Sequence, residues 1–110
     1  MAMTHTKLHA PTQLGTSPST LYTVPASTTT IVKQIALCNT AAANRTVSVY
    51  LVPSGGSASA TNAVLYDVSV DSKSTTFVNL SAVMATGDFI QASASVVSSV
   101  SIHSFGIQEA

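Results

Sequence analysis

The residues of this chain that could do acid–base, nucleophilic or metal chemistry are few and scattered. Its 110 residues include three histidines, four carboxylates and one cysteine. General acid–base catalysis needs a titratable pair with tuned pKa values, and these groups are dispersed along the whole length. We therefore expect no catalytic, cofactor-binding or metal-binding residue and no cofactor, and we predict that the protein is not an enzyme.

The histidines provide the nearest approach to a metal site. His5 and His9 lie four residues apart, a spacing that would place both on one face of a helix. Their segment lacks a helical pattern, and no cysteine or carboxylate lies near them. His103 falls on the last predicted strand, where we interpret it as a hydrogen-bonded structural histidine.

The acidic residues and the cysteine also favour structural roles. Asp71 and Asp88 lie in predicted turns, where aspartate side chains bond the local backbone. Asp67 and Asp71 are too few carboxylates for a calcium loop. Cys38 is the single cysteine, so it cannot form an intramolecular disulfide, and we predict a small buried apolar residue.

The charge content excludes two classes of partner. Only 7% of the residues are charged, and four basic residues balance four acidic ones. Binding to nucleic acid needs several cations to neutralise phosphates, so we expect no nucleic-acid partner. No apolar run approaches the roughly 18 residues of a membrane span, so we expect no membrane partner. A neutral chain has little charge repulsion between copies, which favours a homo-oligomer.

The apolar pattern indicates strands. Serine, threonine and valine dominate, long polar helix formers are scarce, and apolar and polar residues alternate between turn signals. About seven or eight strands result, which favours an all-β fold, an antiparallel β-sandwich of jelly-roll or Greek-key type. The main strands are predicted at residues 20–24, 29–39, 46–52, 63–70, 75–80, 89–93 and 100–108.

Two regions of the chain are predicted to differ in organisation. Residues 1–19 have no clear period, and we expect an extended N-terminal arm, with a short strand near residues 12–14, that leaves the body and contacts another chain. Residues 20–110 are predicted to form a single β-sandwich domain. Residues 53–62 are expected to be a mobile loop, and residues 81–86 a short helical turn or a loop.

Within the sandwich, the alternation predicts a core and one irregularity. Lys33 interrupts an apolar parity, which predicts either a sheet edge or interface at this point, or a β-bulge that switches the parity. The residues predicted to be mostly buried are Ile35, Leu37, Val47, Val49, Leu51, Leu65, Phe77, Leu80, Ile90 and Ile102.

Several stretches between residues 20 and 108 combine strand residues with short turns in a recognisable order. They are Leu21–Lys33, Ile35–Thr40, Val47–Pro53 with Gly55-Gly56, Gly87–Ser93 and Ser101–His103. Together they resemble small structural proteins of the virions of tailed bacteriophages, which include capsid decoration, tail and fibre components. The resemblance brings no catalytic motif and does not include the N-terminal segment.

This resemblance implies a bacteriophage virion structural protein. Within that class we favour a capsid decoration or cement protein that stabilises the shell by binding neighbouring capsid subunits. Its partners would be other virion proteins, the major capsid protein first, and its location would be the virion, assembled in the host cytoplasm. The alternatives are a tail, neck or fibre component, and a carbohydrate- or host-binding β-sandwich module.

Overall fold

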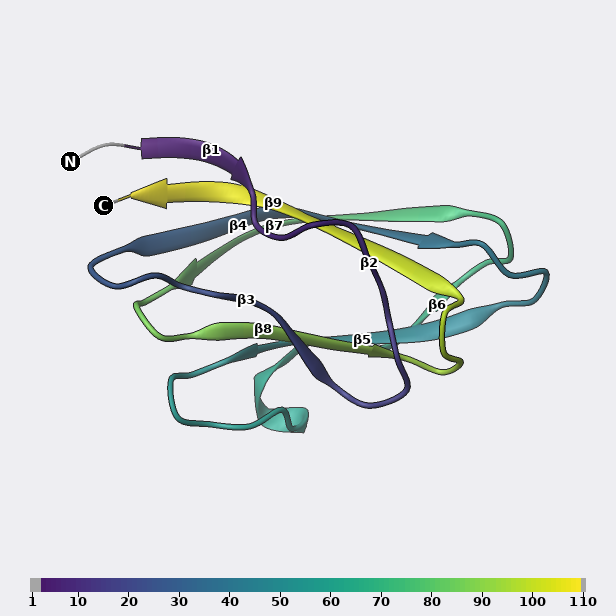
Figure 1. Ribbon diagram of the computed structural model, residues 1–110. Helices are drawn as coiled ribbons and strands as arrows, with labels where there is room; N and C mark the ends of the chain where they lie inside the picture. The colour runs from purple at the N-terminus through teal and green to yellow at the C-terminus, as the bar shows by residue number, and fades with distance from the viewer. Residues whose placement is uncertain (1–2, 110) are drawn as a thin grey trace.

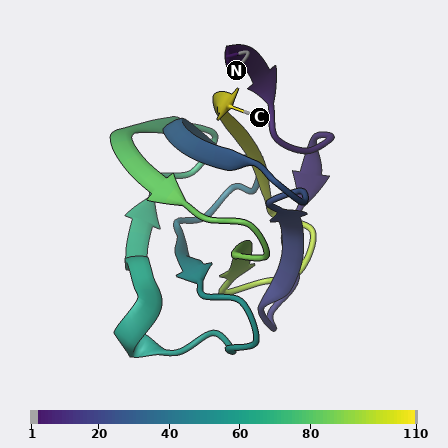
Figure 2. The same cartoon turned by 90° about the vertical axis from the view of Figure 1, so that its left-hand side faces the viewer.

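The computed structural model describes residues 3–109, which form two facing antiparallel sheets (Figures 1 and 2). A single 3-10 turn, η1 (Ala60–Asn62), precedes the sixth strand. The strands are β1 (Met3–Lys7), β2 (Thr12–Gln13), β3 (Ser19–Thr23), β4 (Thr29–Asn39), β5 (Arg45–Val52), β6 (Ala63–Val70), β7 (Thr75–Met84), β8 (Phe89–Ala94) and β9 (Val100–Glu109).

The order of the strands identifies the type of sandwich. One sheet has the order β1-β9-β4-β7, with β2 also paired to β9, and the other has the order β3-β8-β5-β6. With β1 and β2 taken as two parts of one strand, the pairs β1·β9, β3·β8, β4·β7 and β5·β6 are nested in the sequence. A long hairpin rolled so that these pairs alternate between two sheets is a jelly roll. The predicted all-β antiparallel sandwich is therefore confirmed, and the jelly-roll alternative is the one observed.

The core lies between the two sheets and contains most of the predicted residues. Leu51, Leu65 and Leu80 are partly buried and pack against it. Alternate residues of a strand face opposite sides of its sheet, so each sheet contributes one face to this core. Of the residues predicted to be buried, those completely enclosed are Ile35, Leu37, Val47, Val49, Ile90 and Ile102.

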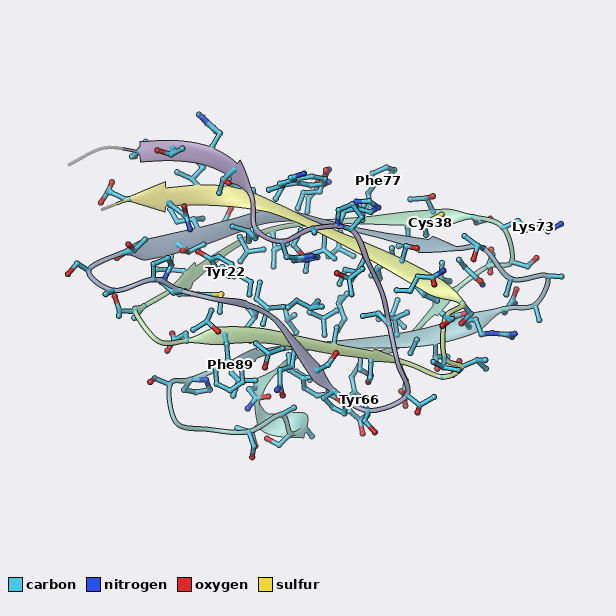
Figure 3. The ribbon with its side chains drawn as sticks, viewed as in Figure 1. Tyr22, Cys38, Tyr66, Lys73, Phe77 and Phe89 are labelled. Carbon is cyan, nitrogen blue, oxygen red and sulfur yellow. The ribbon has the colours of Figure 1, made fainter. Side chains whose placement is uncertain are left out.

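The prediction that Phe77 is buried is wrong, because Phe77 is 62% exposed. On β7, Val78 and Leu80 pack against the core. Phe77 has the opposite parity to these two residues, so it faces away from the core (Figure 3).

The irregularity at Lys33 is a β-bulge. The pairing of β4 with both neighbouring strands shifts between Val32 and Gln34. Lys33 is exposed, and its Nζ donates a hydrogen bond to Ser81 Oγ at 3.0 Å. The extra residue places the lysine in solvent while Val32 and Ile35 on either side remain completely buried. The predicted bulge is therefore confirmed, and a sheet edge at this point is excluded, since β4 is an internal strand.

The expectation that the N-terminal segment leaves the body is wrong for residues 3–14. β1 and β2 both pair with β9, and β2 is the short strand predicted near residues 12–14. Between and after these strands, Leu8 and Leu14 are buried in the core cluster. Two apolar side chains and the free edge of β9 therefore hold the segment on the sandwich (Figure 1).

Residues 53–62 and 81–86 also differ from a simple loop. Residues 53–62 contain η1, in which Asn62 Oδ1 accepts a hydrogen bond from the Ser59 amide at 3.1 Å and Asn62 Nδ2 donates to the Ser57 carbonyl at 2.9 Å.

In residues 81–86, β7 continues to Met84, which is buried, and only then does the chain turn. The apolar parity of β7 extends to Met84, which explains the longer strand.

A polar cluster ties the sheets together near the end where the termini lie. Tyr22 on β3 reaches across to Thr30 on β4, with 2.7 Å between the two hydroxyl oxygens. Gln108 Nε2 on β9 donates to the same tyrosine oxygen at 2.6 Å. Thr30 is completely buried, so this contact satisfies a hydroxyl that would otherwise be desolvated without a partner.

Candidate functional surfaces

The three histidines occupy separate places in the fold. His5 lies on β1 opposite Ile107. His9 is held by the backbone and by a buried serine, with Nδ1 2.8 Å from the Ala10 carbonyl oxygen and Nε2 2.9 Å from Ser104 Oγ. Because a carbonyl only accepts, Nδ1 of His9 carries a proton. These contacts give His9 a structural role.

The acidic residues and the cysteine also lie in separate places in the fold. Asp88 caps a turn as predicted, since its two carboxylate oxygens accept hydrogen bonds from the Ser54 and Ala85 amides, both at 3.0 Å. Cys38 is only partly buried, in contrast to the prediction, because it pairs in register with Thr75 and Ser101 on the outer side of its sheet. Within residues 3–109, no three histidine, cysteine, aspartate or glutamate side chains gather into a group suited to a metal ion.

The outer side of the β1-β9-β4-β7 sheet carries an exposed apolar row. Phe77, Ala36 and His103 are opposite one another on β7, β4 and β9. Phe105 follows His103 on the same side, with ring centroids 6.4 Å apart and an interplanar angle of 15°. We call these four residues the outer aromatic face. Phe77 is 62% exposed and Phe105 is 38% exposed, so two phenyl rings stand in solvent on one sheet.

Two of the lysines border this face. Lys7 pairs with Phe105 across β1 and β9, and Lys33 lies at the bulge on the other side of β9. Together with His5 they line a shallow hollow of about 360 Å³ around Phe105 and Gly106. Cations therefore flank the apolar surface at its Phe105 end.

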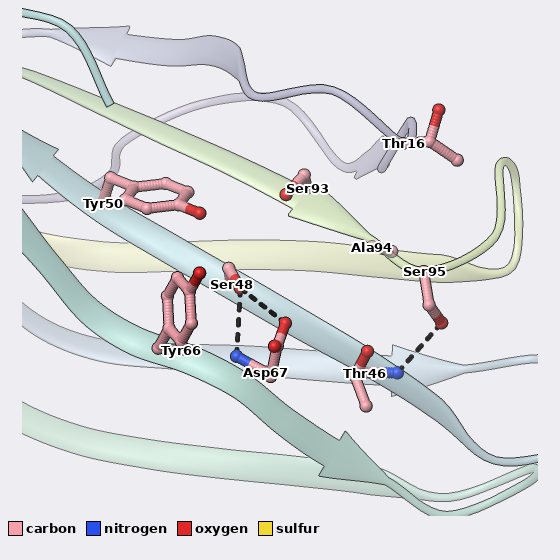
Figure 4. A pocket seen from close by; sticks show the side chains of 9 residues that line it. All are labelled: Thr16, Thr46, Ser48, Tyr50, Tyr66, Asp67, Ser93, Ala94 and Ser95. Atoms are coloured by element: carbon pink, nitrogen blue, oxygen red, sulfur yellow. Dashed lines mark hydrogen bonds between the residues drawn. The ribbon is translucent and has the colours of Figure 1, made fainter. Parts of the chain in front are cut away.

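The opposite sheet carries a second hollow of different chemistry. It has a volume of about 260 Å³ and lies on the outer side of the β8-β5-β6 sheet (Figure 4). We call it the hydroxyl hollow. Side chains with hydroxyl groups dominate its lining, with one carboxylate among them. The lining residues are Thr16, Thr46, Ser48, Tyr50, Tyr66, Asp67, Ser93, Ala94 and Ser95.

A backbone irregularity places the carboxylate in this hollow. Asp67 has a φ of 49°, in the left-handed region that glycine, asparagine and aspartate adopt more readily than other residues. The pairing of β5 with β6 shifts beside it, between Val47 and Val49. Ser48 Oγ accepts a hydrogen bond from the Asp67 amide at 3.0 Å and donates to Asp67 Oδ1 at 3.4 Å.

Comparisons with known proteins show what the fold resembles. No protein-family model matches this sequence, and no curated protein matches it. A solved structure described as Bacillus endospore appendages, "a novel family of disulfide-linked pili", has 11% identity and a TM-score of 0.58. That match covers 96% of this chain and 86% of the other.

Two further matches come from infectious bursal disease virus. The Gx strain structure has 14% identity and a TM-score of 0.56, and it covers 97% of this chain and 32% of the viral one. The Gt strain structure has 11% identity and a TM-score of 0.50, with 97% and 30% covered. This chain therefore spans about a third of the viral chains. At such identities these matches show a shared fold.

Sequence reasoning did not find either surface. The hydroxyl hollow joins residues from β5, β6, β8 and the segment before β3, which are distant in the sequence. The outward parity of Tyr50 on β5 was visible, as it alternates with Val49 and Leu51. For the outer aromatic face, the available signal was the parity of Phe77, which conflicts with that of Leu80 three residues later.

Proposed function

We propose that this chain is a structural subunit of a bacteriophage virion, and specifically a capsid decoration or cement protein that binds neighbouring capsid subunits. Its partners are other virion proteins, the major capsid protein first, and its location is the virion. The observation that carries the proposal is the outer aromatic face, an apolar surface left exposed on a stable two-sheet body.

Three properties of the chain support this proposal. The fold of this chain is similar to that of a matched virus structure and of the matched pilus structure. The sequence between residues 20 and 108 resembles phage structural proteins. The surface offers few charges that would have to be desolvated when it is covered. The described residues contain no helix long and apolar enough to cross a membrane.

The outer aromatic face is suited to burial against a partner. Aromatic side chains are enriched at interface hot spots, because each buries a large apolar area with little loss of conformational freedom. Phe77 and Phe105 stand on neighbouring rows of one sheet, so a single partner surface can cover both. Contact of this kind adds stability to a shell by mass action.

The test uses shells purified from virus particles that lack this protein. Wild-type protein added back is expected to bind them at regular positions in electron micrographs. Phe77→Ser is expected to weaken binding at least about tenfold, because it removes an exposed ring from the interface. Val97→Ser is the matched control, since Val97 is 61% exposed in the β8–β9 turn, away from the aromatic face.

The outcomes separate the alternatives. If the protein does not bind shells but binds purified tails or fibres, it is a tail, neck or fibre component and not a capsid decoration protein. Binding to shells that Phe77→Ser leaves unchanged would contradict the role of the outer aromatic face.

A further inference from the structure

We propose that the hydroxyl hollow is a binding site for a saccharide, with Asp67 and Tyr66 as the residues that contact the sugar most directly. The site lies on the sheet opposite the outer aromatic face, as the positions of Tyr66 and Phe77 show (Figure 3). It is therefore accessible when the other face is covered. The proposal adds a ligand to the protein and does not depend on the proposed virion function.

The polar lining matches a ligand with many hydroxyl groups. Each serine and threonine hydroxyl can donate one hydrogen bond and accept others, and a carboxylate accepts several. Ser48 and Ser93 are paired in register on β5 and β8, so their hydroxyls lie side by side on the outer side of the sheet. Residues Thr16, Thr46 and Ser95 lie at the far end from the tyrosines (Figure 4). A sugar ring likewise carries several hydroxyl groups, each of which can donate and accept hydrogen bonds.

The two tyrosines supply the apolar part of the site. Tyr50 is buried within the sheet surface, whereas Tyr66 is 60% exposed. Both rings lie at one end of the hollow with their hydroxyl groups directed into it (Figure 4). An exposed ring beside a group of hydroxyls can pack against the apolar face of a sugar while the hydroxyls fix its orientation.

The backbone conformation of Asp67 places its carboxylate among the hydroxyl groups of the hollow. A left-handed backbone is less unfavourable for aspartate than for most residues, and glycine avoids the cost altogether. The fold nevertheless holds an exposed carboxylate here, with its amide fixed by Ser48. The side chain accepts one long hydrogen bond, at 3.4 Å, so acceptor capacity remains for a ligand. This remaining acceptor capacity, on an exposed carboxylate among hydroxyl groups, suits the hydroxyl donors of a sugar.

The chemistry of the lining selects against other ligands. Asp67 is the single carboxylate of the lining, and the remaining lining residues carry no charge, so the hollow lacks the cations that an anion needs and the several carboxylates that a metal ion needs. Its volume of about 260 Å³ lies just below the range of drug-sized ligand sites, roughly 300–1,000 Å³. A site of this size accommodates one sugar ring.

The test is a titration of isotope-labelled protein with four sugars, followed by two-dimensional NMR. The probes are glucose, galactose, N-acetylglucosamine and rhamnose, each raised to about 50 mM, because a single-ring ligand binds with millimolar affinity. At least one probe is expected to give saturable shifts at the amides of Tyr66, Asp67 and Ser93. The absence of saturable shifts with all four sugars would overturn the proposal.

Variants assign the binding to the hollow. Asp67→Asn tolerates the left-handed backbone and removes the charge, and Tyr66→Ala removes an exposed ring, so both are expected to fold and to lose at least about tenfold in affinity. Val83→Ala is the control, since Val83 is 71% exposed on β7 of the opposite sheet, and this variant is expected to bind as the wild type does. Sugar binding that neither hollow variant weakens would also overturn the proposal.

Asp67→Gly provides a second measurement on the same residue. Glycine relieves the backbone strain, so the melting temperature is expected to stay the same or rise while sugar binding is lost. A variant that is less stable than the wild type and binds the sugar equally well would show that Asp67 has a structural role instead.

Discussion

Replacing Gly106 with alanine is expected to destabilise the protein by about 3 kcal/mol, measured as the free energy of unfolding in urea. Gly106 lies on β9 opposite Val32, next to the bulge at Lys33. An added Cβ would collide with the carbonyl oxygen of Ile31 and would lie 3.4 Å from the Val32 Cα atom. Both are backbone atoms of the neighbouring strand, so relief requires a shift of β4 or β9 and loss of ladder hydrogen bonds.

Gly15→Ala is the matched control for this variant. A Cβ at Gly15 would have no heavy atom within 4 Å. The control is expected to unfold within about 0.5 kcal/mol of the wild type, as for other surface substitutions. Equal stability of the two alanine variants would show that β9 and β4 do not approach each other as closely at the bulge as the structure has them.

Truncation of Leu37 to alanine is expected to cost about 2–5 kcal/mol of unfolding free energy. Leu37 is completely buried in the middle of the sandwich, on β4 between β9 and β7. The substitution leaves a cavity that neighbouring strands can fill only in part, because their backbones are fixed by hydrogen bonds on both sides.

The sequence expectation placed both Leu37 and Phe77 in the core. The variant Phe77→Ala distinguishes that expectation from the observed structure. Phe77 is exposed, so its truncation is expected to change the unfolding free energy by less than about 1 kcal/mol. Large and similar losses for Leu37→Ala and Phe77→Ala would contradict the register of β7.

Local patterns predicted the strands well. The predicted segments 29–39 and 63–70 coincide with β4 and β6, because alternation and the turn residues between them are local signals. The bulge was also foreseeable, since a lysine on an apolar parity requires an exception to the alternation. Phe77 was misplaced because Phe77 and Leu80 were both assigned to the core although they have opposite parity, and Val78 and Leu80 define the inward one.

Long-range pairing was beyond local signals. A jelly roll and another Greek-key sandwich can have similar strands, and they differ in which distant strands are neighbours. The N-terminal segment shows the same limit, because Leu8 and Leu14 alone produce no periodic pattern, and only the presence of β9 reveals their burial. The hydroxyl hollow depends on this pairing and on the φ of Asp67, which no sequence pattern indicates.

The central claim is that this protein acts by contact through largely uncharged surfaces. Lys7 and Lys33 are the charged residues that line the hollow beside Phe105, so few ion pairs can contribute to binding at the outer aromatic face. At 0.1 M ionic strength, salt largely screens the attraction between exposed charges more than about 10 Å apart, whereas it leaves apolar contact intact. Binding through this face should therefore depend little on salt.

The most direct measurement is the affinity of the protein for shells that lack it, determined at low and at high ionic strength. The account predicts that affinity changes by less than about tenfold between roughly 50 mM and 500 mM salt. A loss of affinity of about a hundredfold or more over that range would show an electrostatic interface and would contradict the account.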